Sequence, residues 1–259
     1  ANGDLDVDGH TELDDVNISG VTTAGIITGA TYYGDGQFLT NVGAAATNAW
    51  ISDAQYNLVA GECAGANRDA DTERNVIIGT SAGCKLNAGD YNVFLGANAG
   101  YYTTTGNTNF YGGYAAGVCN QSGDKNVAIG SEALKGTGTP ANNTGGCNVA
   151  IGHQASMKMK SGTHNIALGQ LSLGGANVTG SYNVAFGYQS GCALTSGAAH
   201  ILIGKYAGKG LGGSQDNIFM GLYSGCATSG GSYNVAIGAN TMIGTGNKTG
   251  NTSLGRFAG

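Results

Sequence analysis

The chain has 259 residues, of which 49 are glycine and one is proline, and its formal net charge is −5 with only 10% charged residues. Glycine without a strict three-residue period or abundant proline excludes collagen, and a hydrophobic fraction of 41% argues against a disordered chain. No basic stripe is present, and no apolar run approaches the ~20 residues of a membrane span. We therefore expect no nucleic-acid partner and no membrane insertion.

Residues 1–43 do not share the repeat found later in the chain. Leu5, Val7, Val16 and Ile18 alternate with polar residues, which predicts a strand-rich linker or docking segment with turns at glycines. The run Asp4-x-Asp6-x-Asp8-Gly also imitates a calcium loop, but that loop needs flanking helices, and the flanks are strand-like. An alternating strand is the favoured interpretation, with a metal at Asp4, Asp6 and Asp8 as the alternative.

Residues 44–56 form the next segment and are expected to be a linker or a cap. Trp50, the only tryptophan, is expected to pack against the end of the repeats that follow.

Residues 57–259 repeat one pattern twelve times: an asparagine, three mostly apolar residues and a glycine, as in NVAIG at 126–130, 148–152 and 234–238. Successive patterns are spaced by 17 residues eight times, by 18 twice and by 22 once. A fixed period of this length is typical of stacked repeats that bury their apolar faces against their neighbours. The sequence predicts an all-β fold, a parallel β-solenoid (β-roll) of about twelve 17-residue rungs, ~55–60 Å long at ~4.8 Å per rung.

The apolar columns of the repeat indicate how the strands face. With asparagine as position zero, positions one and three are apolar in all but one repeat each, and β-branched residues dominate position one. We expect these two columns to form the core of the solenoid and position two to point outward. Position two is also largely apolar, and a strand that is apolar on both faces is buried on both. This pattern predicts several identical chains packed around a common axis, and a homotrimer is the natural closed form.

Two further columns predict the backbone geometry of each turn. Position four is glycine in every repeat, which indicates positive φ or a close backbone approach; representative members are Gly79, Gly96, Gly130, Gly152, Gly187 and Gly238. Position zero is asparagine except at His200, which predicts a ladder of side-chain amides along the stack; representative members are Asn92, Asn126, Asn148, Asn183 and Asn234.

Two features interrupt the regular pattern. The 22-residue spacing contains an insertion at 135–147, which is either a tolerated bulge or a binding loop, because insertions in solenoids map to loops on one face. The six cysteines show no CxxC spacing, and those in related columns lie two repeats apart, too far for a disulfide. We expect buried free thiols, with bridges between chains as the alternative.

The chain resembles phage tail-fibre-like repeat proteins, especially structural proteins of cyanobacterial and marine phages. The segments LDVDGHTELDDVNISGVTTAG (5–25) and YYGDGQFLTNV (32–42) resemble their linkers, and NVAIGxxAG resembles their repeats. The repeat is also similar to the head repeats of trimeric autotransporter adhesins. This resemblance implies a homotrimer of parallel β-solenoids on a virion or cell surface. The repeat pattern continues to the last residue, Gly259.

The function expected from these patterns is a non-enzymatic structural fibre of a phage virion that contributes to host-surface attachment, extracellular and in contact with other virion proteins. A bacterial trimeric surface adhesin or extracellular filament subunit is the alternative. Carboxylates and histidines do not fall into a triad or metal spacing, so we expect no catalytic residue, no enzyme and no cofactor. If a host glycan is bound, the expected contacts are outward aromatics near the glycine column: Tyr101, Tyr102, Tyr114, Tyr188, Tyr206, Tyr223 and Phe257.

Overall fold

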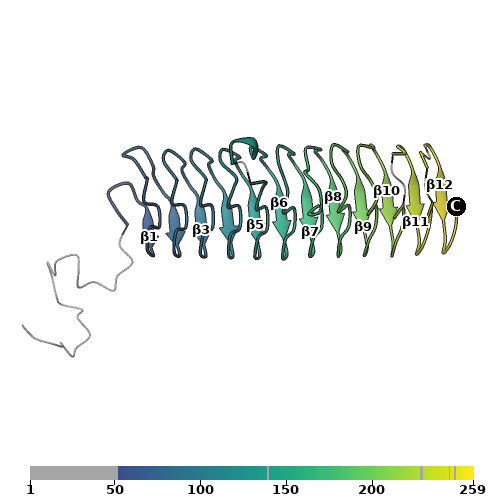
Figure 1. Cartoon of the computed structure of the whole chain (residues 1–259), viewed down its shortest axis with the longest axis horizontal. Helices are drawn as coiled ribbons and strands as arrows, with labels where there is room; N and C mark the ends of the chain where they lie inside the picture. Colours follow the sequence, from purple (N-terminus) through teal and green to yellow (C-terminus); the bar gives the residue numbers. More distant parts are fainter. Residues whose placement is uncertain (1–51, 139, 228–229, 245, 248) are drawn as a thin grey trace, which may run out of the picture. The chain divides into compact units, whose positions relative to one another are not determined.

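The repeats form one parallel β-solenoid in the computed structural model, which describes residues 52–138, 140–227, 230–244, 246–247 and 249–259. Each turn contributes one three-residue strand, and the twelve strands lie in chain order in a single sheet (Figure 1). The strands are β1 (Leu58–Ala60), β2 (Val76–Ile78), β3 (Val93–Leu95), β4 (Phe110–Gly112), β5 (Val127–Ile129), β6 (Val149–Ile151), β7 (Ile166–Leu168), β8 (Val184–Phe186), β9 (Ile201–Ile203), β10 (Ile218–Met220), β11 (Val235–Ile237) and β12 (Thr252–Leu254). The predicted fold class is confirmed.

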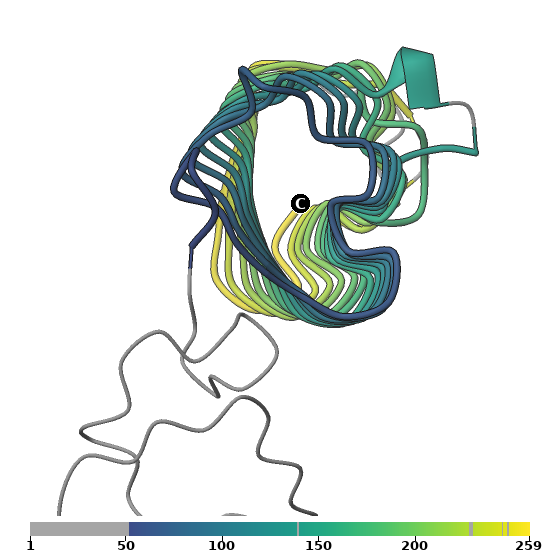
Figure 2. The same cartoon turned by 90° about the vertical axis from the view of Figure 1, so that its left-hand side faces the viewer.

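The strands pair in register, so that each residue lies beside the same position of the neighbouring turn. Val127 of β5, for example, pairs with Phe110 of β4 and with Val149 of β6, even though the insertion separates β5 from β6. Viewed along the stack, the turns superpose on one outline, and the inserted loop with the 3₁₀ helix η1 (Pro140–Asn142) projects from it (Figure 2). The insertion therefore leaves the register of the sheet unchanged.

The chain turns at backbone positions with positive φ that recur in every repeat. Around β3, Tyr91 before the asparagine has φ 58°, Gly96 has φ 132° and Asn98 has φ 57°. Left-handed φ costs a non-glycine residue about 1–2 kcal/mol. Hydrogen bonds to the previous turn hold these residues, as where the Asn98 N–H donates to the Thr80 carbonyl at 2.9 Å.

The core of the solenoid contains position two, which corrects the orientation expected from the sequence. Ile77, Phe94, Tyr111, Leu202 and Phe219 at this position are fully buried. Small position-seven residues and apolar residues of the returning turn complete the core, including Ala82, Ala99, Ala116, Leu86, Leu194 and Leu211. Positions one and three, which were expected to form the core, lie on the outer face and are half-buried or exposed.

The asparagine column explains this orientation. Asn92 and Asn126 at position zero are fully buried, and side chains of a strand alternate between its two faces. Position two must therefore share the inner face with the asparagine, and positions one and three must face outward. The strand is apolar on both faces, as expected, but positions one and three form its outer face and position two its inner face.

The glycine at position four allows the turns to stack closely. A Cβ atom on Gly96 would lie 2.7 Å from the carbonyl oxygen of Gly113, and one on Gly79 would lie 2.5 Å from the carbonyl oxygen of Gly96. No side chain fits at such distances, and φ near 130° is open only to glycine. The predicted role of this column is confirmed.

The expectations for the N-terminal part fall outside the described residues. They concern the strands of residues 1–43, the calcium alternative at Asp4, Asp6 and Asp8, and the packing of Trp50.

Candidate functional site

The asparagine side chains form a continuous ladder through the inside of the solenoid. Each side-chain Oδ1 accepts the backbone N–H of the asparagine one turn later, as from Asn109 N to Asn92 Oδ1 at 2.9 Å and from Asn126 N to Asn109 Oδ1 at 2.9 Å. Each Nδ2 donates to a turn carbonyl, as from Asn148 to the Gly162 oxygen at 2.9 Å. The predicted amide ladder is confirmed, and its polar groups are used for stacking.

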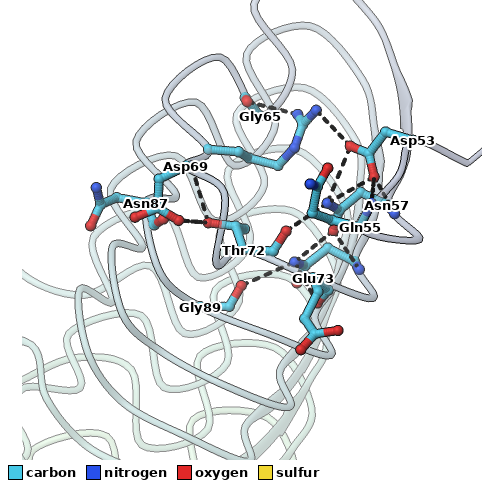
Figure 3. A network of polar contacts seen from close by, with 11 residues as sticks. Asp53, Gln55, Asn57, Gly65, Asp69, Thr72, Glu73, Asn87 and Gly89 are labelled. Carbon is cyan, nitrogen blue, oxygen red and sulfur yellow. Dashed lines mark hydrogen bonds and ion pairs between the residues drawn. The ribbon is translucent and has the colours of Figure 1, made fainter.

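Asp53 occupies the place of an asparagine at the N-terminal end of this ladder (Figure 3). Its Oδ1 accepts the Asn57 backbone N–H at 2.8 Å, and Arg68 forms an ion pair with Oδ2 at 3.2 Å. Burial alone would raise the pKa of Asp53, but the hydrogen bonds from Asn57 and the Arg68 charge outweigh it and lower that pKa. The carboxylate therefore caps the first turn in its ionised form.

Three of the aromatics predicted for glycan contact lie together on the turns that follow β8, β9 and β10. The rings of Tyr206 and Tyr223 stack with centroids 4.8 Å apart, and Tyr188 meets Tyr206 edge-on at 5.4 Å. The ammonium group of Lys205 lies 5.2 Å from the Tyr206 ring centroid, and that of Lys209 lies 4.6 Å from it. We call these five residues the tyrosine–lysine cluster.

The other predicted aromatics lie apart from this cluster. Tyr101 and Tyr102 meet edge-on at 4.7 Å on the turn after β3. Tyr114 follows β4 and is exposed. Phe257 follows β12 and is exposed beneath the guanidinium of Arg256, at 4.6 Å from its ring centroid. The solenoid thus spreads the seven predicted aromatics over four places, of which one holds three.

A second set of exposed tyrosines was missed by the sequence interpretation. They stand one residue before the asparagine, and each is more than half exposed: Tyr56, Tyr91, Tyr182 and Tyr233. The Arg74 guanidinium lies between two of them, 5.8 Å from the Tyr56 ring centroid and 5.4 Å from that of Tyr91. The recurring Tyr-Asn dipeptide is the signal that could have revealed this column.

The cysteines and histidines form no catalytic arrangement among the described residues. All six thiols are free within the chain, but only Cys119 is buried and Cys63 is exposed, which corrects the expectation of buried thiols. Partial burial raises the pKa of Cys119, Cys192 and Cys226, which disfavours the nucleophilic thiolate. No group of three histidine, cysteine or acidic side chains in the described ranges is placed to hold a metal ion. His200 belongs to the asparagine ladder, where its Nδ1 accepts the Asn217 N–H.

The insertion forms a loop closed by its own hydrogen bonds. The Asn143 side chain accepts the Thr137 N–H at 2.8 Å and donates to the Thr137 carbonyl at 2.9 Å. Beside the loop lies an open depression of about 260 Å³, lined by Lys135, Gly136, Thr137, Gly138, Met157, Lys158 and Asn177. No aromatic residue lines it, so the tyrosine–lysine cluster is the better candidate for ligand contact.

The described part of the chain contains no long apolar helix of the kind that crosses a bilayer. No protein-family model, curated protein or solved structure matches the chain.

Proposed function

We propose that the chain is a structural, non-enzymatic subunit of a homotrimeric fibre, displayed on a phage virion in contact with other virion proteins and used in attachment to the host surface. The observation that carries the multi-chain part is the outer face of the sheet. Its two columns contain no charged residue in any of the twelve strands. Seven of these side chains are exposed despite being large and apolar: Ile129, Ile151, Ile166, Phe186, Ile201, Ile237 and Leu254.

The size of this face supports an interface between copies. Eleven inter-strand steps of ~4.8 Å make it ~53 Å long, and two side-chain columns make it ~10 Å wide, or ~500 Å². The largest apolar patch on a monomer is typically roughly 300–600 Å². The four exposed tyrosines one residue before the strands would add ~400 Å² if they border this face and each exposes ~100 Å². The sum reaches the ~800 Å² per partner of a standard interface.

A second copy of this chain fits the face better than an unrelated partner does. The face repeats with the period of the turns, and a parallel copy has the same period and the same uncharged side chains at equal heights. When the outer faces of several copies pack around one symmetry axis, the apolar side chains of every copy are buried. This is the arrangement of a closed symmetric oligomer. The resemblance to phage tail-fibre repeats supports the number three and the virion.

The interface is tested by placing charge on the outer face. In the double variant Ile129→Lys/Ile151→Lys, both lysines would be buried without partners, so we expect it to sediment as a monomer while the wild type sediments as a trimer. Thr105→Lys/Ser122→Lys adds the same charge at exposed positions of the polar turn and is expected to remain trimeric. Equal sedimentation of the two double variants would contradict the proposed interface.

The location is tested on intact particles. Antibodies raised against residues 57–259 are expected to decorate projecting fibres of the phage in electron micrographs. Decoration of bacterial cells without phage would instead favour the surface-adhesin alternative.

A further inference from the structure

The tyrosine–lysine cluster combines three aromatic rings and two ammonium groups on neighbouring turns of the solenoid. Tyr188 and Tyr223 are each 36% exposed, and Lys205 is exposed beside them. Among the described residues, neither Lys205 nor Lys209 forms an ion pair with a carboxylate. The cluster therefore presents hydroxyl groups and two uncompensated positive charges to the solvent.

The backbone holds this cluster in place before any ligand arrives. The Tyr206 N–H donates to the Tyr188 carbonyl at 3.0 Å, and the Tyr223 N–H donates to the Lys205 carbonyl at 3.0 Å. Tyr206 and Tyr223 occupy the left-handed backbone position that recurs in every turn, with φ of 62° and 55°. Binding would need little further ordering, which favours affinity.

The charge distribution along the chain makes the surroundings of the cluster positive. Residues 1–132 contain fifteen acidic and four basic residues, whereas residues 133–259 contain one acidic residue, Asp216, and seven basic residues. A net charge of −5 thus conceals an acidic first half and a basic second half. Anions approaching the solenoid are attracted to its C-terminal turns, where the cluster lies.

We propose that the tyrosine–lysine cluster binds an anionic polysaccharide, through its carboxylate or sulfate groups. The ammonium groups of Lys205 and Lys209 would neutralise the acidic groups, and the tyrosine hydroxyls would donate hydrogen bonds to them. The exposed parts of the Tyr188 and Tyr223 rings would meet the apolar faces of the sugar rings. Two lysines can contact one or two acidic groups on a short stretch of sugar chain, whereas a nucleic acid requires a longer basic track for its continuous phosphates.

This inference rests on the attachment role proposed above but not on the trimer. Its test measures the affinity of the full chain by titration calorimetry at low salt for four probes: polygalacturonate, dextran sulfate, neutral amylose and a twenty-residue oligothymidylate. We expect binding of one or both anionic polysaccharides that weakens as salt is added, and no binding of amylose. A preference between polygalacturonate and dextran sulfate identifies the acidic group as carboxylate or sulfate.

Matched variants locate the binding. Lys205→Gln/Lys209→Gln is expected to lower the affinity about tenfold, the effect of losing charge-assisted hydrogen bonds. Lys125→Gln/Lys160→Gln removes the same charge away from any aromatic ring contact and is expected to bind as the wild type does. Tyr223→Ala is expected to weaken binding about fivefold or more, because it removes both an aromatic face and a hydroxyl.

Four results would overturn the proposal: no binding of either anionic polysaccharide, amylose bound as tightly as they are, oligothymidylate bound more tightly than either, or equal loss in the two lysine double variants. Light scattering on each variant distinguishes failure of the binding proposal from failure of the fibre proposal, because the variants of the tyrosine–lysine cluster are expected to keep the wild-type mass. A variant that loses binding together with its mass is replaced in the comparison by Lys205→Gln alone.

Discussion

The Nδ1 atom of His200 accepts the backbone N–H of Asn217 at 3.2 Å, in the place where other turns of the ladder use an asparagine Oδ1. Its Nε2 lies 2.9 Å from the Ser214 carbonyl oxygen, where an asparagine Nδ2 would donate. A neutral imidazole with its proton on Nε2 satisfies both contacts, whereas a protonated ring would present a donor to the Asn217 N–H. Histidine thus replaces asparagine only while it is neutral.

Stability is therefore expected to fall as the pH decreases below the ordinary histidine value. Burial lowers the pKa of His200, and the hydrogen bond to Ser214 and the nearby Asp216 charge only partly offset this. Between the folded pKa and the ordinary value of 6.5, the unfolded chain binds a proton that the folded chain does not. Thermal unfolding followed between pH 8 and pH 5 should show a loss of stability that His200→Asn reduces; an identical pH dependence in that variant would contradict the assignment.

Removing an asparagine from the middle of the ladder is expected to destabilise the fold. In Asn126→Ala, the Asn148 N–H loses its acceptor inside the solenoid, and the Gly145 carbonyl keeps only the longer 3.4 Å hydrogen bond from Asn120, at a cost of about 2–3 kcal/mol. Asn251→Ala serves as control, because Asn251 lies exposed at the last turn. Its side-chain Nδ2 donates to Asn234 Oδ1 at 3.1 Å, and no later turn depends on it. Chemical denaturation should give Asn126→Ala a clearly lower free energy of unfolding than Asn251→Ala. Equal losses of stability in the two variants would contradict the stabilising role of the buried ladder.

The glycine column is expected to tolerate no side chain within the stack. In Gly130→Ala, the added Cβ would lie 2.8 Å from the Gly152 carbonyl group, and φ of 125° would remain strained, so we expect a loss of about 3 kcal/mol or more. Gly138→Ala is the matched control, since beyond its two chain neighbours no heavy atom lies within 4 Å of its added Cβ. The measurement is the midpoint of denaturant unfolding, and a small shift in Gly130→Ala would refute the close-approach argument.

Replacing a core tyrosine by phenylalanine is expected to stabilise the solenoid. Tyr111 stacks on Phe94 with ring centroids 5.2 Å apart, and its buried hydroxyl lies near the Asn126 side chain without a hydrogen bond of regular geometry. Tyr111→Phe removes this unpaired polar group and should gain about 1 kcal/mol. The reverse change, Phe94→Tyr, should lose stability in the same denaturation assay. A destabilised Tyr111→Phe would show that the hydroxyl has a partner.

The period, the glycine column and the asparagine ladder were predictable because each follows from a residue type repeated at a fixed position. The face of each strand that points into the core was not predictable, since three apolar residues in a row show no alternation of polar and apolar side chains. The alanines at position two, such as Ala128 and Ala150, are fully buried, and their small size could have indicated a crowded interior. Once Asn126 is known to be a buried ladder residue, strand alternation places position two on the same inner face.

The contacts on the surface were not predictable from local sequence either. Tyr188 stands at position five, whereas Tyr206 and Tyr223 stand at position six, and only the stacking of turns shows that all three meet. The column containing Tyr91 and Tyr182 was missed because left-handed φ before the asparagine turns these side chains outward, which composition does not reveal. Local sequence therefore predicted the rung better than the contacts between rungs.

The central claim, that copies of this chain cover one another's outer sheet face, is tested most directly by the mass of the wild-type chain in solution. Light scattering coupled to size-exclusion chromatography, over a hundredfold range of concentration, should give three times the 25.7 kDa chain mass. A particle of 25.7 kDa at every concentration would contradict the proposal.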